Sequence, residues 1–242
     1  MTPSDPDMTD LAGDVTRYRE GAGLPSETLD EILASVHSQT IDEPPSARGQ
    51  LRELSTAKRV LAVTGALVVT GAVSTLGLVR GDLTASELGL VALLCAGLGG
   101  LMLAVVQLAL QGLHQATAQH ARHAVLGLGL GTPLLASLLP VWPGADTTGS
   151  GWLSHVAVCG ALGLISSVVG AGIVVMFQRS DRGPLWRIAS AGVAGGLAGM
   201  VARTISCPAG DVAHVALAHG QLALLTAALC VGVASLRGRL VG

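Results

Sequence analysis

Six long apolar stretches constrain this chain more than any other feature of its sequence. A helix needs about 20 consecutive apolar residues to cross the hydrocarbon core of a bilayer. We predict membrane-spanning helices at 60–79, 88–110, 124–141, 155–177, 185–206 and 214–236. Only 12% of the residues are charged, whereas soluble domains carry about 25%. The sequence therefore predicts an all-α fold, a polytopic membrane helical bundle with six transmembrane helices.

The basic residues alternate between the connections of these helices. They lie before the first stretch, between the second and third, between the fourth and fifth, and after the sixth: Lys58, Arg59, Arg122, Arg179, Arg182, Arg187, Arg237 and Arg239. The remaining connections are poor in basic residues. Because short cytoplasmic loops carry an excess of Lys and Arg, this alternation predicts a multi-pass protein with its N-terminus and C-terminus cytoplasmic.

Residues 1–57 are expected to form a short, partly disordered, acidic cytoplasmic head, and 58–242 the transmembrane domain. No signal peptide is evident at the start of the chain, so we expect the head to stay in the cytoplasm. Within it, "LPSETLDEILASVHSQ" predicts an amphipathic helix. Its apolar stripe is formed by Leu29, Ile32, Leu33 and Val36. We expect the stripe to bind a partner, or else to pack on the rest of the head or the membrane surface.

The stretch "CPAGDVAHVALAHG" places a cysteine, an aspartate and two histidines between the fifth and sixth apolar stretches. The predicted topology puts it on the outer face, together with His155 and Cys159 at the start of the fourth helix. Counting the rise of a helix inward, Cys159 and His219 lie at similar depth, and we expect them to be partners. His214 and His219 are five residues apart, so they should face different directions unless the helix starts late or irregularly.

These residues suggest a shared metal or thiol site, with three arrangements left open. Thiolate and imidazole are ligands for a transition metal such as zinc. Alternatively, Cys159 and Cys207 form a disulfide, or each residue packs separately. Arg203, inside the fifth helix, is expected to support the site by pairing with Asp211 or by lowering the pKa of Cys207. The alternative for Arg203 is that it snorkels to the headgroups.

Other features of the membrane domain are less informative. The sequence contains no Walker loop, no GxSxG and no HExxH motif, so we expect no enzymatic activity. The cytoplasmic histidines, His114, His120 and His123, are expected in a solvated loop. Overlapping GxxxG patterns in the fifth helix predict close helix packing within the chain or, alternatively, a homodimer.

Several of these residues resemble the NrsF-like family of bacterial six-span membrane anti-sigma factors. The resemblance rests on Cys159 in the fourth span, "ISCP" ending the fifth, the following "HVALAHG", and the "LRGR" ending. It implies a protein of the bacterial inner membrane whose head sequesters an extracytoplasmic-function sigma factor, without itself binding nucleic acid. A metal or oxidative signal at the outer Cys/His cluster would release the sigma factor.

Two other functions stay open from the sequence. The first is a small transporter or metal-handling membrane protein that uses the same cluster, although carboxylates are missing from the middle of the predicted spans. The second is a membrane redox enzyme with a dithiol pair, although Cys159 and Cys207 lie on separate helices. The acidic head favours the regulatory interpretation, because a transporter has no evident need for it.

Overall fold

The structure is a computed structural model that describes residues 31, 47–75, 81, 83–111, 118–139, 142, 149, 151–178 and 184–241. The chain divides into two units, Met1–Ala47 and Arg48–Gly242. Of the first unit, the structure describes only Glu31, which is helical and exposed, and Ala47. The predicted stripe of Leu29, Ile32, Leu33 and Val36 lies outside the described residues, so the head stays a prediction.

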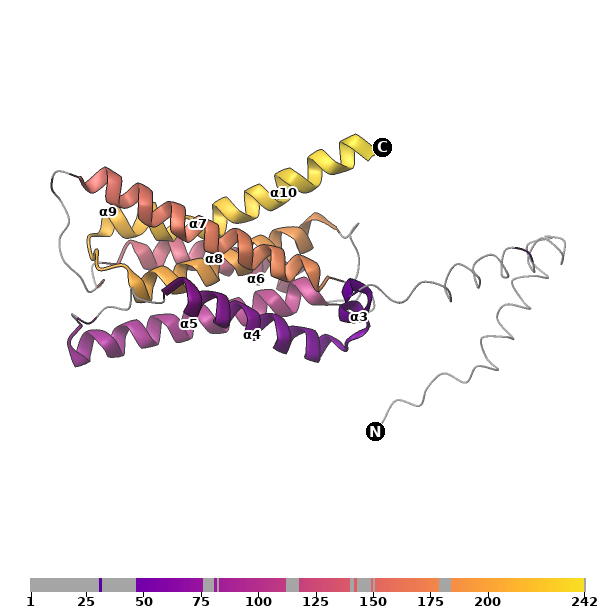
Figure 1. The fold of residues 1–242 in the computed structure, drawn as a ribbon, viewed down its shortest axis with the longest axis horizontal. Helices are drawn as coiled ribbons and strands as arrows, with labels where there is room; N and C mark the ends of the chain where they lie inside the picture. Colours follow the sequence, from indigo (N-terminus) through magenta and orange to yellow (C-terminus); the bar gives the residue numbers. More distant parts are fainter. Residues whose placement is uncertain are drawn as a thin grey trace. The chain divides into compact units, whose positions relative to one another are not determined.

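The second unit is built from helices, as predicted. They are α3 (Ala47–Glu53), α4 (Thr56–Thr75), α5 (Ala85–Leu110), α6 (Gln119–Ser137), α7 (Trp152–Met176), α8 (Leu185–Ser206), α9 (Val212–Val215), the π-helix η1 (Ala216–Gly220) and α10 (Leu222–Val241). Successive long helices run in alternating directions (Figure 1). As a result, α3 and the last residues of α10 lie toward one end of this unit, and α9 lies toward the other.

Five helical segments in the described part of the chain are long and apolar enough to cross a membrane: α4, α5, α7, α8 and the run Val212–Arg237. A multi-pass membrane protein is therefore supported. The predicted third span corresponds to α6, a helix of 19 residues that contains Pro133. Because α6 begins with the polar run "QHARH", it is not one of the five, and a sixth span stays a prediction.

Capping explains why α5 begins three residues before the predicted start. The Thr84 side chain accepts a hydrogen bond from the backbone N–H of Glu87, and the Thr84 N–H donates to the Glu87 carboxylate at 2.8 Å. This reciprocal pair is a capping box, which satisfies backbone N–H groups that the first turn of a helix leaves unpaired. The apolar run alone does not mark this start, because Ala85, Ser86 and Glu87 are not strongly hydrophobic.

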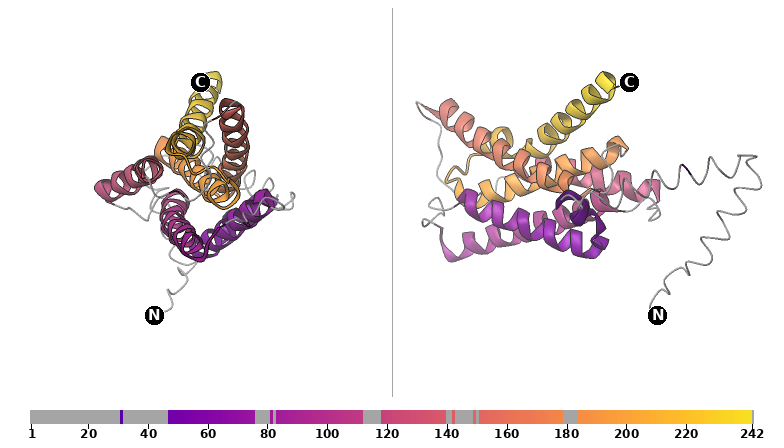
Figure 2. Two further views of the ribbon diagram at one scale, coloured as in Figure 1. Left: turned by 90° about the vertical axis from the view of Figure 1, so that its left-hand side faces the viewer. Right: turned by 45° about the vertical axis from the view of Figure 1, so that its right-hand side comes forward.

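The core of the unit is α8, which lies between α7 and α10 on one side and α4 and α5 on the other (Figure 2). Both predicted GxxxG patterns are used for this packing. Cβ atoms added at Gly192 and Gly196 would overlap the backbone of α10, and Cβ atoms at Gly195 and Gly199 would overlap α7. Glycine permits such close backbone approach. These glycine faces therefore pack within the chain, and a homodimer stays a prediction.

Arg59 holds three helix ends together at the α3 end of the unit. Its side chain is fully buried and donates hydrogen bonds to the carbonyls of Leu54, Leu110 and Phe177, each at 3.1 Å, and to the Thr56 hydroxyl at 3.0 Å. Leu110 ends α5 and Phe177 caps α7. From the charge pattern, Arg59 was assigned to a connection between helices. In the structure its side chain lies inside the unit and bonds to carbonyls that helix ends leave unpaired.

Candidate metal centre

Four of the predicted site residues lie together at the α9 end of the unit: Cys159, Cys207, His214 and His219. All four are buried, and one ligand atom from each lies within 4.8 Å of the others. The Cys159 Sγ lies 3.2 Å from the Nε2 of His219, and the Cys207 Sγ lies 3.3 Å from the Nε2 of His214. The structure thus brings together two thiols and two imidazoles from α7, the end of α8, α9 and η1.

The π-helix η1 explains how His214 and His219 share one side of their helix. In an α-helix, residues five apart face different directions, but a π-turn closes with an i to i+5 hydrogen bond. The two rings therefore lie 5.3 Å apart, centroid to centroid, in an edge-on arrangement. The two histidines were expected to diverge unless their helix were irregular, and the structure contains such an irregular helix, η1.

The turn between α8 and α9 positions Cys207 and the start of the helix that carries His214. Cys207 caps the C-terminal end of α8, and Pro208 follows, which cannot continue the helix. Asp211 then caps α9 by accepting a hydrogen bond from the backbone N–H of His214 at 2.7 Å. Its carboxylate also accepts one from the Trp152 indole at 3.3 Å. Asp211 therefore ties the start of α9 to the start of α7, beside the cluster.

The geometry suits a four-coordinate metal ion. Bonds of about 2.0–2.3 Å to Zn²⁺ place tetrahedral ligand atoms about 3.3–3.8 Å apart. The two sulfur–nitrogen distances, 3.2 and 3.3 Å, are already close to this range, and the four atoms need to contract only slightly from their 4.8 Å spread. Two thiols and two imidazoles form a donor set that zinc and other borderline or soft ions prefer.

The surroundings of Cys207, which lies just beyond the last residue of α8, favour its thiolate. A hydrogen bond from Cys159 lowers the pKa of the Cys207 thiol; burial opposes this effect, and the neighbouring His219 adds to it. The thiolate is the form of cysteine that binds metals. All four cysteines of the chain, including the half-buried Cys95 and Cys230, are free thiols.

The remaining predicted site residues lie around the cluster. His155 is exposed in the first turn of α7, and its ring lies 5.1 Å from that of His214. Arg203 is only 3% exposed and donates a hydrogen bond from Nη2 to the carbonyl of Ser74 at 3.0 Å. This buried contact with α4 argues against the alternative that Arg203 snorkels to the headgroups. The proposed pairing of Arg203 with Asp211 stays a prediction.

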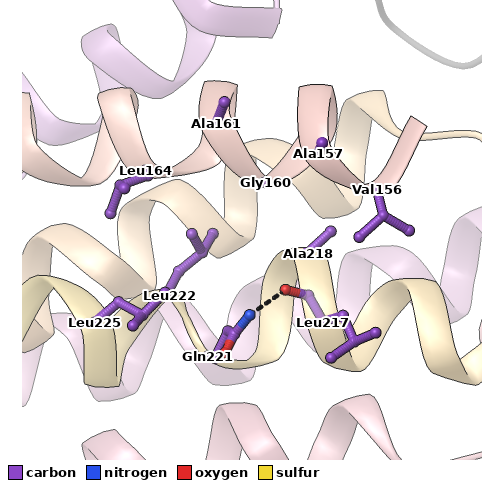
Figure 3. Close-up of a pocket in the computed structure, with 10 residues that line it drawn as sticks. All are labelled: Val156, Ala157, Gly160, Ala161, Leu164, Leu217, Ala218, Gln221, Leu222 and Leu225. Carbon is purple, nitrogen blue, oxygen red and sulfur yellow. Dashed lines mark hydrogen bonds between the residues drawn. The ribbon is translucent and has the colours of Figure 1, made fainter. Parts of the chain in front are cut away.

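An apolar groove of about 360 Å³ runs along the flank of the cluster, between α7 on one side and η1 and α10 on the other (Figure 3). Gly160 and Ala218, the chain neighbours of Cys159 and His219, line it. Gln221 is its one polar side chain, and its amide donates a hydrogen bond to the backbone carbonyl of Leu217. On this flank the cluster is therefore screened by side chains that, apart from that of Gln221, offer no metal ligand.

Of the histidines predicted to be cytoplasmic, the two that the structure describes do not join this cluster. His120 and His123 are exposed at the start of α6, and His114 lies outside the described residues. Comparison of the chain with protein-family models, with curated proteins and with solved structures gives no match. The arrangement of the residues is therefore what supports a function.

Proposed function

We propose that this protein is a membrane-bound anti-sigma factor that senses a transition metal through Cys159, Cys207, His214 and His219. The observation that carries the sensing half is the burial of four soft and borderline ligand atoms within 4.8 Å of one another on consecutive helices. The regulatory half is supported by the acidic N-terminal segment and by the sequence resemblance. The expected partner is an extracytoplasmic-function sigma factor, held at the inner face of a bacterial inner membrane.

A metal ion suits the cluster better than an oxidant does. An oxidant acting on Cys159 and Cys207 would need only the two thiols, whereas here each thiol already contacts an imidazole nitrogen. With the two thiols, the two histidines complete a four-ligand coordination sphere. A disulfide between the thiols would give the histidines no role. The proposed signal is therefore an ion of the zinc class.

Signal transmission requires the ion to bind one arrangement of the helices better than another. The four ligands come from helical segments that a bound ion would draw together, because the ligand atoms are spread over 4.8 Å without it. We expect the movement to reach the head through α4, since Arg203, next to the cluster, is bonded to the carbonyl of Ser74 near the end of α4. The head precedes α4 in the sequence and joins its other end, the N-terminal one.

The alternative is a small metal-handling membrane protein that uses the same four ligands. The exposed His155, whose ring lies 5.1 Å from that of His214, is the observation that favours it, because transport needs a ligand within reach of solvent. Both functions require metal binding. They differ in whether a sigma factor accompanies the protein.

Co-purification tests the regulatory proposal directly. The full-length protein, captured from native membranes in detergent, should bring down a sigma factor in stoichiometric amount, and added zinc should reduce that amount. The double variant Leu29→Asp, Leu33→Asp should lose the sigma factor while remaining in the membrane. Zinc binding without any sigma factor would instead establish the metal-handling alternative.

A further inference from the structure

Three imidazoles form a row that leads from the surface to the buried cluster. His155 is exposed, whereas His214 is 0% and His219 only 1% exposed. The ring centroids of His155 and His214 are 5.1 Å apart, and those of His214 and His219 are 5.3 Å apart. His155 is not one of the four clustered ligands, so a closed four-coordinate site gives it no role.

We propose that His155 is a loading ligand, which takes a zinc-class ion from solvent and passes it to His214 and so to the buried site. This inference rests on the metal binding proposed above. Imidazole nitrogen is a ligand for such ions, and neighbouring rings at these separations allow transfer after small side-chain rotations. During transfer the ion exchanges bound water for protein ligands, and each thiol that is protonated releases one proton as it binds.

The flank of the cluster that faces the apolar groove explains why the ion should enter on the side of His155 instead. On that flank, α7 and η1 approach each other across the apolar groove, whose one polar side chain is that of Gln221 (Figure 3). A hydrated divalent ion has no ligand to bind along that surface and would meet a high desolvation cost. His155 supplies a solvent-exposed nitrogen ligand directly beside one of the four buried residues.

The surroundings of the two buried histidines suit an ion that binds reversibly. The Nδ1 atoms of His214 and His219 are buried and have no hydrogen-bond partner in the described part of the chain. In most metal sites this second nitrogen donates to a carboxylate or carbonyl, which fixes the ring and strengthens binding. Rings without this support can turn toward a neighbouring ligand, as transfer from His155 to His214 requires.

The test measures how fast cobalt(II), used as an optical probe for zinc, enters the full-length protein in detergent micelles. Stopped-flow absorbance of the thiolate-to-cobalt band gives the loading rate, and competition with a chelator gives the release rate. We expect His155→Ala to slow both loading and release by about tenfold. Loss of a residue that supports a metal ligand typically changes metal affinity or activity by at least this factor. Because both rates fall together, the affinity and the final spectrum should not change.

Two further variants sharpen the measurement. His123→Ala removes an equally exposed histidine on α6 and should load as the wild type does. His155→Asp keeps a metal-binding side chain at the loading position and should restore much of the rate, which a purely structural role of His155 would not explain. Cys159→Ser with Cys207→Ser provides the baseline without thiolate absorbance.

Each contrary outcome has its own meaning. Loading of His155→Ala at the wild-type rate would overturn the loading role while leaving metal binding intact. Loss of affinity with a changed spectrum would overturn it as well, since His155 would then be a permanent ligand. If the wild type binds no cobalt, the proposed metal sensing is wrong, and the loading role with it.

Discussion

The two ends of the membrane unit both bury polar side chains, but these side chains have different partners. At one end, the Arg59 guanidinium bonds to three backbone carbonyls and a hydroxyl. At the other, two thiols and two imidazoles face one another, and the Nδ1 atoms of both imidazoles lack a hydrogen-bond partner in the described structure. The second end therefore presents the ligand atoms of the proposed metal site, whereas the first end presents a guanidinium whose partners are already in place.

This contrast suggests that one end stabilises the fold and the other binds the ligand. In the proposed function, the cluster end gains metal–ligand bonds when a cation is present, and this makes it the responsive end. At the other end, the hydrogen bonds of Arg59 hold α4 to the ends of α5 and α7. Helix α7 connects the two, since Cys159 and Phe177 are separated by 18 residues of helix and helix cap, or about 27 Å.

The largest effect should follow from removing the Arg59 guanidinium. Arg59→Met keeps the buried stem but leaves the carbonyls of Leu110 and Phe177 without their donor, so we expect the free energy of unfolding to fall by about 3–5 kcal/mol. Denaturant titration in micelles, followed by circular dichroism, measures it. Lys58→Met is the matched control, because Lys58 is exposed. Equal stability of the two variants would refute this role of Arg59.

Metal addition should produce the next largest effect, and only at the responsive end. At a free zinc concentration of about 100 times Kd, binding stabilises the folded state by about 2.7 kcal/mol. The melting temperature should therefore rise with zinc in the wild type and in Cys95→Ser, whose thiol lies outside the cluster. It should not rise in Cys207→Ser. A zinc response that survives in Cys207→Ser would place the ion elsewhere.

The same contrast shows what the sequence could and could not predict. The helical class, five apolar spans and the grouping of Cys159 with His219 follow from composition, charge alternation and the count of residues along each helix. The approach of His214 to His219 does not, because the π-turn at Ala216–Gly220 adds one residue to a turn without a composition that reveals it. The sequence also did not predict the burial of Arg59, because a basic residue before an apolar run usually remains in solvent.

Helix packing near the centre of the unit should be sensitive to a single added methyl group. A Cβ at Gly196 would overlap the backbone of Ala223 on α10, so Gly196→Ala should destabilise the fold by about 2 kcal/mol through overpacking. Gly172→Ala is the control, because a Cβ there meets nothing within 4 Å. Chemical denaturation distinguishes the two variants. If both tolerate alanine, α8 and α10 are farther apart than the structure places them.

The smallest effect on stability should come from Asp211, but it tests how the cluster is positioned. Removing a helix N-cap by Asp211→Ala costs about 1 kcal/mol, whereas asparagine caps nearly as well as aspartate. Because the Asp211 carboxylate holds the backbone of His214 at 2.7 Å, the alanine variant should also bind zinc about tenfold more weakly. Asp211→Asn should retain most of the affinity. Isothermal titration of the three proteins separates the effects: equal losses in Asn and Ala would mean that the charge matters, and no loss in either would mean that α9 holds His214 without its cap.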